Sequence, residues 1–166
     1  MPSFSSVGAG KAHSCALAPK EGEIYCWGLN DSGQLGAEVM QTCGEMVGCS
    51  QSPVQVDLAG AKAAHLAVGL DHACAVLSDN SIRCWGDNMR GQLGPTVQMS
   101  WSREPQEVDL SVQEGVVQLV SGGNHTCAVT ESRALYCWGD NSKGQLGHSS
   151  PSERGVYRVP IRRRLD

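Results

Sequence analysis

The feature that most constrains this chain is a sequence unit that occurs three times. Each copy begins with His-x-Cys-Ala, continues about ten residues later with Cys-Trp-Gly, and ends with Gly-Gln-Leu-Gly. The copies start at His13, His72 and His125, so the repeat length is roughly 50 to 60 residues, which is typical of propeller blades and related arrays. The chain is therefore expected to be a repeat protein.

Composition favours a fold made of strands. The 166 residues include 20 glycines and a single phenylalanine, which indicates many turns rather than a helical bundle. The formal net charge of -4 argues against a nucleic-acid partner, which would require a strongly basic surface. No apolar stretch approaches the roughly 20 residues of a membrane-spanning segment, and the first residues resemble neither a signal nor a transit peptide.

Alignment of the three copies predicts about four short strands in each. The first precedes the histidine, and the next two are the His-x-Cys and Cys-Trp segments, which form a hairpin. The last glycine of the following loop is expected to have a positive φ angle. A segment that starts with proline is expected to form the fourth, edge strand. The first strands are expected at 5–10, 64–70 and 116–123, the loop glycines are Gly36, Gly94 and Gly147, and the proline segments are 53–58, 105–110 and 160–165.

Four strands per unit is the content of one propeller blade. The prediction is an all-β fold in which three four-stranded, propeller-like blades form an open arc or part of a β-propeller. The chain forms a single repeat domain, 1–166, with units at approximately 1–58, 59–110 and 111–166. The phased His-x-Cys-Ala, Cys-Trp-Gly and Gly-Gln-Leu-Gly motifs resemble the regulator of chromosome condensation family in its cysteine-containing variety. That resemblance covers nearly the whole chain and implies a seven-bladed propeller.

Three blades cannot close a ring alone, because propellers need at least four. An open arc exposes strand edges, and exposed edges pair with other chains. Residues 158–165 could supply the outer strand of a neighbouring blade. The expected partners are therefore further repeats, a second copy of the chain or a different subunit. The alternative is a stable three-blade arc whose edges are twisted or charged.

The cysteines predict cross-links within the blades. Counting inward along each hairpin places Cys15 opposite Cys26, Cys74 opposite Cys84, and Cys127 opposite Cys137. Directly opposed residues have Cα atoms roughly 4.5 to 5.5 Å apart, which a disulfide accepts. Cys43 and Cys49 remain and are expected to close their own loop. Four disulfides indicate an oxidising compartment: secreted, periplasmic or an organelle lumen. The alternative is free, buried cysteines that pack as small hydrophobic residues.

Metal binding receives less support than structural roles. Each unit offers only two cysteines and one histidine, without the Cys-x-x-Cys pairs of zinc sites, so no metal and no cofactor are expected. We expect the three repeat histidines to hydrogen-bond to backbone between blades. The Gly-Asp-Asn triplets at 86–88 and 139–141 could bind calcium, but a turn-stabilising role is favoured because each loop has only one aspartate.

The tryptophans divide into two groups. Trp27, Trp85 and Trp138 recur at one position and are expected to fill the space between sheets, with ligand stacking as the alternative. Trp101 lies with Met99 in an irregular connection, 98–105, where a partner-binding site that includes Arg103 is predicted. The insertion 37–51 also interrupts the repeat, and loops of this kind tend to carry function.

The arginine run near the end of the sequence, Arg162, Arg163 and Arg164, is a candidate site for an acidic partner or a lipid surface. A solvated tail is the alternative. The run is too short for a convincing nucleic-acid patch.

No catalytic motif occurs, so the chain is not expected to be an enzyme. The favoured function is a protein-interaction module, acting as a structural or stabilising subunit docked in a larger assembly. A secreted, lectin-like sugar binder is an alternative. The resemblance also implies a guanine-nucleotide exchange role, since the founding nuclear member acts on a small GTPase and binds chromatin. Exchange fits poorly with three blades, a mild charge and a cysteine pattern unsuited to a reducing nucleus.

Overall fold

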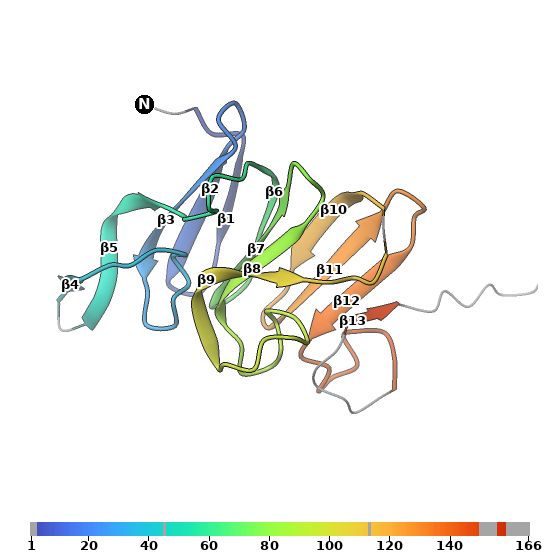
Figure 1. The fold of residues 1–166 in the computed structure, drawn as a ribbon. Coiled ribbons are helices and arrows are strands. Elements are labelled where there is room, and N and C mark those ends of the chain that lie inside the picture. Colours follow the sequence, from blue (N-terminus) through green and yellow to red (C-terminus); the bar gives the residue numbers. More distant parts are fainter. Residues whose placement is uncertain (1–2, 45, 113, 150–155, 159–166) are drawn as a thin grey trace, which may run out of the picture.

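A computed structural model describes residues 3–44, 46–112, 114–149 and 156–158. Within these ranges every regular element is a strand, and the strands form three antiparallel sheets, here called blades 1, 2 and 3 (Figure 1). The predicted all-β, three-blade architecture is confirmed.

The order of strands runs from the inner to the outer edge of each blade. Blade 1 has the order β1 (Ser6–Ala9), β2 (His13–Ala18), β3 (Glu23–Leu29), β5 (Met46–Gln55) and β4 (Gln41–Cys43). Blade 2 has the order β6 (Ala63–Val68), β7 (His72–Leu77), β8 (Ile82–Asp87) and β9 (Trp101–Val108). Blade 3 has the order β10 (Val116–Ser121), β11 (His125–Thr130), β12 (Leu135–Gly139) and β13 (Val156–Arg158).

The fourth strand of each blade differs from the prediction. Blade 1 has five strands instead of four, because the insertion 37–51 forms β4 and the beginning of β5. Pro53 and Pro105 lie inside β5 and β9 rather than at their starts. Both prolines fall where the pairing register shifts, so the missing N–H interrupts no regular ladder bond. The segment 160–165 lies outside the described residues.

The blades are stacked in chain order, with blade 2 between the other two (Figure 1). Their inner strands are neighbours, since β6 contacts both β1 and β10. Backbone hydrogen bonds join the blades at this inner end: Lys11 N donates to Leu70 O (2.8 Å) and Leu70 N donates to Gly123 O (3.0 Å).

Two hydrophobic cores fill the spaces between the blades. Each blade has a disulfide face, which carries its hairpin cysteines, and an opposite tryptophan face, which carries the repeat tryptophan. The disulfide face of blade 1 packs on the tryptophan face of blade 2, where Cys15 and Leu17 meet Ala75 and Trp85. The next joint repeats this arrangement between blades 2 and 3. Blade 2 is therefore covered on both faces.

Candidate protein-interaction surfaces

The eight cysteines form four disulfides, and each hairpin disulfide joins directly opposed strand positions. The Cα–Cα distances are 4.1 to 4.2 Å in the hairpins and 6.0 Å between Cys43 and Cys49. The three hairpin pairs are those that the strand register predicts, and the Cys43–Cys49 bond is the expected closure of the insertion by its own two cysteines. Short cross-links of this kind fix the register of each β-hairpin.

The loop after each hairpin is fixed by its own side-chain amides. In blade 2 the Asn88 Oδ1 accepts from Leu93 N (3.0 Å), and the Gln92 Oε1 accepts from Arg90 N (2.8 Å). Gln92 Nε2 also donates to Asp87 Oδ2. Blade 3 repeats these bonds. Blade 1 does so with one change: Leu29 stands at the position of Asp87, and Gln34 Nε2 donates to Asp31 Oδ1 instead. The Gly-Asp-Asn residues thus stabilise turns, and the loop holds the glutamine backbone carbonyl towards the neighbouring blade.

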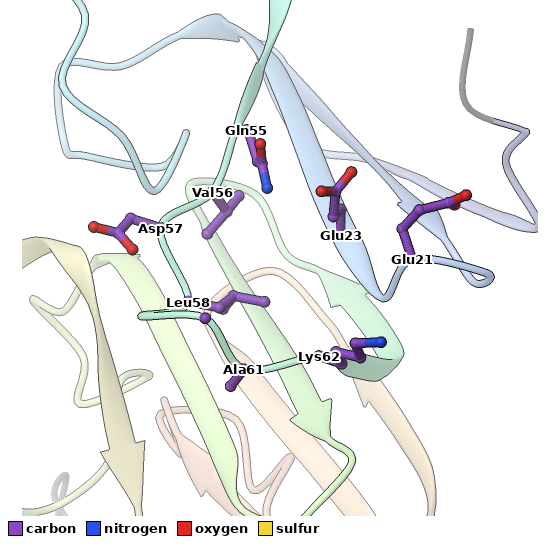
Figure 2. A pocket seen from close by; sticks show the side chains of 9 residues that line it. Glu21, Glu23, Gln55, Val56, Asp57, Leu58, Ala61 and Lys62 are labelled. Carbon is purple, nitrogen blue, oxygen red and sulfur yellow. The ribbon is translucent and has the colours of Figure 1, made fainter.

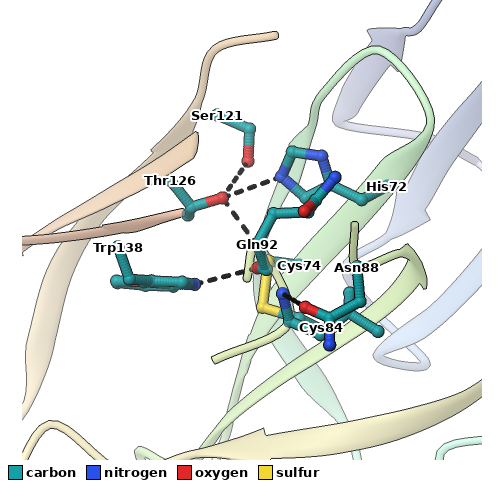
Figure 3. Close-up of a disulfide and its surroundings, with 9 residues drawn as sticks. His72, Cys74, Cys84, Asn88, Gln92, Ser121, Thr126 and Trp138 are labelled. Atoms are coloured by element: carbon teal, nitrogen blue, oxygen red, sulfur yellow. Dashed lines mark hydrogen bonds between the residues drawn. A yellow bond between two sulfur atoms is a disulfide. The ribbon is translucent and has the colours of Figure 1, made fainter. Parts of the chain in front are cut away.

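The repeat tryptophan of the next blade donates a hydrogen bond to that carbonyl across the joint, the interface between two successive blades. Trp85 Nε1 donates to Gln34 O (3.1 Å), and Trp138 Nε1 donates to Gln92 O (3.0 Å), as Figure 3 shows for the second joint. Both indoles are fully buried. Their role is therefore to pack and register successive blades.

A second contact across the joint uses the repeat histidine. His72 Nε2 is hydrogen-bonded to Thr126 Oγ1 (2.9 Å), and Thr126 Oγ1 also contacts Ser121 Oγ (2.9 Å; Figure 3). The prediction of a backbone partner is wrong for His72, because the next blade presents the Thr126 hydroxyl to the imidazole ring. In the first joint the position of Thr126 is taken by Ala73, and both ring nitrogens of His13 lack a hydrogen bond.

The role of Thr126 was missed in the sequence. Its column in the repeat alignment holds Ser14, Ala73 and Thr126, each directly after the repeat histidine. Two of the three residues, Ser14 and Thr126, have hydroxyl side chains, and this is the only sequence pattern that points to a hydrogen-bonding role. The function of this position is evident only in the structure, where Thr126 of β11 lies within hydrogen-bond distance of His72 of β7.

The tryptophan face of blade 1 is covered by no other blade in the described part of the chain. Val7 is 71% exposed, whereas its equivalents in the other blades, Leu66 and Leu119, pack into the two joints. Trp27 on this face is half-buried, in contrast to the other repeat tryptophans. Phe4 covers the face in part by an edge-on contact with Tyr25 (ring centroids 6.0 Å apart), yet Phe4 itself is 48% exposed.

Among the described residues, the disulfide face of blade 3 is also incompletely covered. Val120 is 48% exposed, while its blade 2 equivalent, Ala67, is buried in the second joint. Cys127 and Val129 are half-buried, although their counterparts in blades 1 and 2 are buried. The described chain therefore carries one uncovered face of each kind, and the two faces are the halves of an inter-blade joint.

The match to known proteins follows the same repeat. Models of the Regulator of chromosome condensation (RCC1) repeat match residues 4–34, 63–92 and 116–145, and, in a second version, residues 21–76, 79–129 and 134–163. The second set spans most of the chain. The chain belongs to the RCC1-repeat family.

Individual relatives are much longer than this RCC1-repeat chain. It is 35% identical to the probable E3 ubiquitin-protein ligase HERC6 of Homo sapiens, over 92% of the chain and 15% of that protein. It is 34% identical to the Homo sapiens regulator of chromosome condensation, over 84% of the chain and 31% of that protein. Yeast RCC1 (Prp20), solved bound to Kap60, shares the fold with a TM-score of 0.79 at 22% identity, covering 96% of this chain and 38% of that one. The chain thus spans less than two fifths of each.

A separate exposed surface lies on the outer rim of blade 2. Trp101 belongs to strand β9, so the expectation of an irregular connection at that residue is wrong. It is 47% exposed, and the loop that precedes β9 carries two further exposed apolar residues, Met89 and Met99. Arg103 Nη1 pairs with Glu38 Oε1 of blade 1 at 3.3 Å. This rim remains a predicted partner-binding site. Arg162, Arg163 and Arg164 lie outside the described residues.

An open pocket of about 480 Å³ lies where blade 1 meets the segment leading to blade 2 (Figure 2). It is lined by Glu21, Glu23 and Asp57, with Lys62 as a cation at its margin. Among the described residues, no cluster of histidine, cysteine or carboxylate side chains could hold a metal ion. Those residues also contain no helix long and apolar enough to span a membrane.

The buried histidines have strongly altered titration. Burial lowers the pKa of His72 to about 3, with smaller contributions from His13 and His125. Burial likewise lowers the pKa of His13 to about 4; the nearby Leu70 backbone opposes this shift but makes no good hydrogen bond to the ring. Both histidines are therefore neutral in the folded chain at neutral pH.

This titration predicts acid sensitivity. The unfolded chain binds protons on these histidines near pH 6.5, whereas the folded chain does so only near pH 3 to 4. The contribution of these neutral histidines to the free energy of unfolding is therefore fully present above pH 6.5. It decreases as the pH is lowered below that value. At pH 5 we expect a loss of about 2 kcal/mol from His72 alone. Urea unfolding at pH 7.5 and pH 5 measures this loss.

Substitution assigns the effect to one histidine. His72→Gln is expected to reduce the difference between the two pH values, because glutamine does not titrate. His65→Gln is the control, since His65 is exposed on β6, and it should retain the wild-type acid sensitivity. An unchanged difference in His72→Gln would contradict the assignment.

Proposed function

We propose that this chain is a non-enzymatic protein-interaction module that acts as a structural or stabilising subunit in a larger assembly. It docks through the tryptophan face of blade 1 and the disulfide face of blade 3. The observation that carries this proposal is the exposure of Val7 at 71%, at a position where the other two blades pack a leucine into a joint. Exposed apolar surface of this kind is typical of protein interfaces.

The relatives support an interaction role without specifying the partner. Yeast RCC1 (Prp20) is described in complex with another protein, Kap60. The four disulfides support an oxidising compartment for this chain, because such bonds are rare where thiols are kept reduced. The assembly is therefore proposed to form outside a reducing cytosol or nucleus.

The lectin-like alternative has less support. Trp85 and Trp138 are fully buried, and both use their indole N–H between blades. They offer no ring face to a sugar. Trp101 is the most exposed tryptophan, and it belongs to the apolar rim of blade 2 with Met99. Such a composition favours protein contact.

Site-specific photo-cross-linking tests the proposed docking faces. A photoreactive amino acid is placed at Val7, at Val120 or, as a control, at His65 on the exposed side of β6, and the protein is irradiated in its native cellular setting. Cross-links to protein are expected from the first two positions and not from the third. Absence of cross-links from both faces would contradict the proposed function, whichever protein is the partner.

A further inference from the structure

Two asparagines lie in the tripeptide Asn-x-Ser/Thr, which is the acceptor motif for N-linked sugars in secreted proteins. Asn30 heads the tripeptide 30–32, and Asn124 heads the tripeptide 124–126. Such a short motif points to a sugar only where the folded chain leaves the asparagine amide at the surface. The structure separates the two positions.

The Asn30 side chain is committed to its own loop. Its Oδ1 accepts from Leu35 N (2.9 Å), and its Nδ2 donates to Ala37 O (3.0 Å). These bonds fix the loop that presents the Gln34 carbonyl to Trp85. A sugar on Nδ2 would add a ring beside the loop backbone, which conflicts with this arrangement.

The Asn124 side chain is free of such a role. It lies in the turn between β10 and β11, where its backbone carbonyl accepts from Asp140 N (2.8 Å). Its side-chain amide has no hydrogen bond in the described part of the chain. The residue is partly exposed and belongs to neither core between the blades. A group attached at Nδ2 therefore breaks no bond of the fold.

The equivalent residues of the other blades show that this turn stays at the surface. Ala12 of blade 1 is exposed, and Asp71 of blade 2 is partly exposed. Blade 2 has a neighbour on both of its faces and still leaves Asp71 accessible. The accessibility of Asn124 is thus independent of what packs on the faces of blade 3.

The third residue of the tripeptide sets the order of events. Recognition of the motif includes the hydroxyl of this residue. In the folded chain Thr126 has no exposed surface, and its hydroxyl is bonded to His72 Nε2 and Ser121 Oγ. The hydroxyl is accessible only before blade 3 packs on blade 2. Modification must therefore precede folding of this joint.

We propose that Asn124 is an N-glycosylation site, modified before folding in the oxidising compartment where the disulfides form. The donor is an oligosaccharide linked to a lipid diphosphate. Asn124 Nδ2 attacks the anomeric carbon, a C–N bond forms, and the bond from that carbon to the diphosphate oxygen breaks. The lipid diphosphate leaves, and the amide loses one proton to a base of the transferring enzyme. The inference rests on the proposed function only through the oxidising compartment.

Translation of the full chain behind a cleavable signal peptide into microsomal vesicles tests the site, because the vesicles supply the sugar donor and the enzyme. The soluble, disulfide-bonded fraction is expected to be heavier than 17.6 kDa and to return to that mass after treatment with a peptide N-glycosidase. The treatment leaves aspartate at the modified position, so peptide masses identify it. An unshifted mass in that fraction, or a sugar on Asn30 alone, would overturn the inference.

Three variants assign the shift to one residue. Asn124→Gln should abolish it, whereas Thr126→Ser should retain it because serine keeps the hydroxyl of the motif. Ser32→Ala is the matched control: it removes the other tripeptide without changing either Asn30 amide bond, and it should leave the shift unchanged. Without the vesicles, Asn124→Gln should unfold at the wild-type urea midpoint. A lower midpoint would contradict the unbonded amide on which the assignment depends.

The chain isolated from its own source distinguishes the site from the proposed function. A sugar on Asn124 supports the inference. An unmodified Asn124 in a chain with four intact disulfides overturns the site and leaves the docking faces as proposed. Unmodified Asn124 together with free thiols contradicts both the site and the oxidising compartment. The cross-links from Val7 and Val120 test the docking faces separately.

Discussion

Replacement of Trp85 by alanine is expected to lower the free energy of unfolding by about 3–5 kcal/mol. Trp85 has no exposed surface, lies in the core between blades 1 and 2, and donates its indole N–H to Gln34 O. Alanine leaves a cavity between two sheets and an unbonded carbonyl, because Gln34 is itself fully buried. The loss is a large part of the stability of an ordinary domain. Urea unfolding followed by fluorescence or circular dichroism measures it.

The same substitution at Trp27 provides the internal comparison. Trp27 occupies the equivalent position on the uncovered face and is half-buried, so Trp27→Ala should cost less than half as much. Both variants are compared with the wild-type chain at the same pH and protein concentration. Equal losses at the two positions would show that burial of the tryptophan between blades is not the cause.

Trp85→Phe separates the hydrogen bond from the packing. Phenylalanine retains most of the apolar volume but has no N–H for the Gln34 carbonyl. The expected loss is about 1–3 kcal/mol, the cost of an unsatisfied buried acceptor. A loss as large as that of Trp85→Ala would indicate that the indole shape dominates.

Removal of the blade 2 disulfide has the second large expected effect. The Cys74→Ala, Cys84→Ala double variant is expected to lose about 3–4 kcal/mol, measured by urea unfolding without reductant. The cross-link closes a hairpin with a sequence separation of 10, and both cysteines are completely buried. Its loss frees the unfolded chain and also removes two sulfur atoms from the core of the second joint.

The disulfide of the insertion is the matched control. Cys43 and Cys49 join β4 to β5 at the edge of blade 1, and Cys43 is partly exposed. The main contacts of strand β4 are with β5 of its own sheet, so this region can open without separating the blades. The Cys43→Ala, Cys49→Ala variant should change the main unfolding transition by less than about 1 kcal/mol. A greater loss than in blade 2 would contradict this distinction.

The number of blades, the hairpins and the partners of the six hairpin cysteines can be predicted from local patterns in the sequence. These features depend on residues within one copy of the repeat, where an antiparallel hairpin has a fixed register. Once Cys127 and Cys137 were placed on facing strands, their opposition followed from the alternation of side chains. The loop glycines were predictable for the same reason, and Gly36, Gly94 and Gly147 all have positive φ.

The role of each copy of a repeated residue depends on the packing of the blades. Trp27, Trp85 and Trp138 all lie in a Cys-Trp-Gly-x-Asn segment, yet only the last two have a blade on their face. The partner of His72 is Thr126, 54 residues away, and no local pattern encodes that distance. Pro53 likewise lies within a strand, because the register shift that tolerates it involves both paired strands. Local periodicity specifies a blade, but burial and hydrogen bonding between blades depend on which sheet lies opposite.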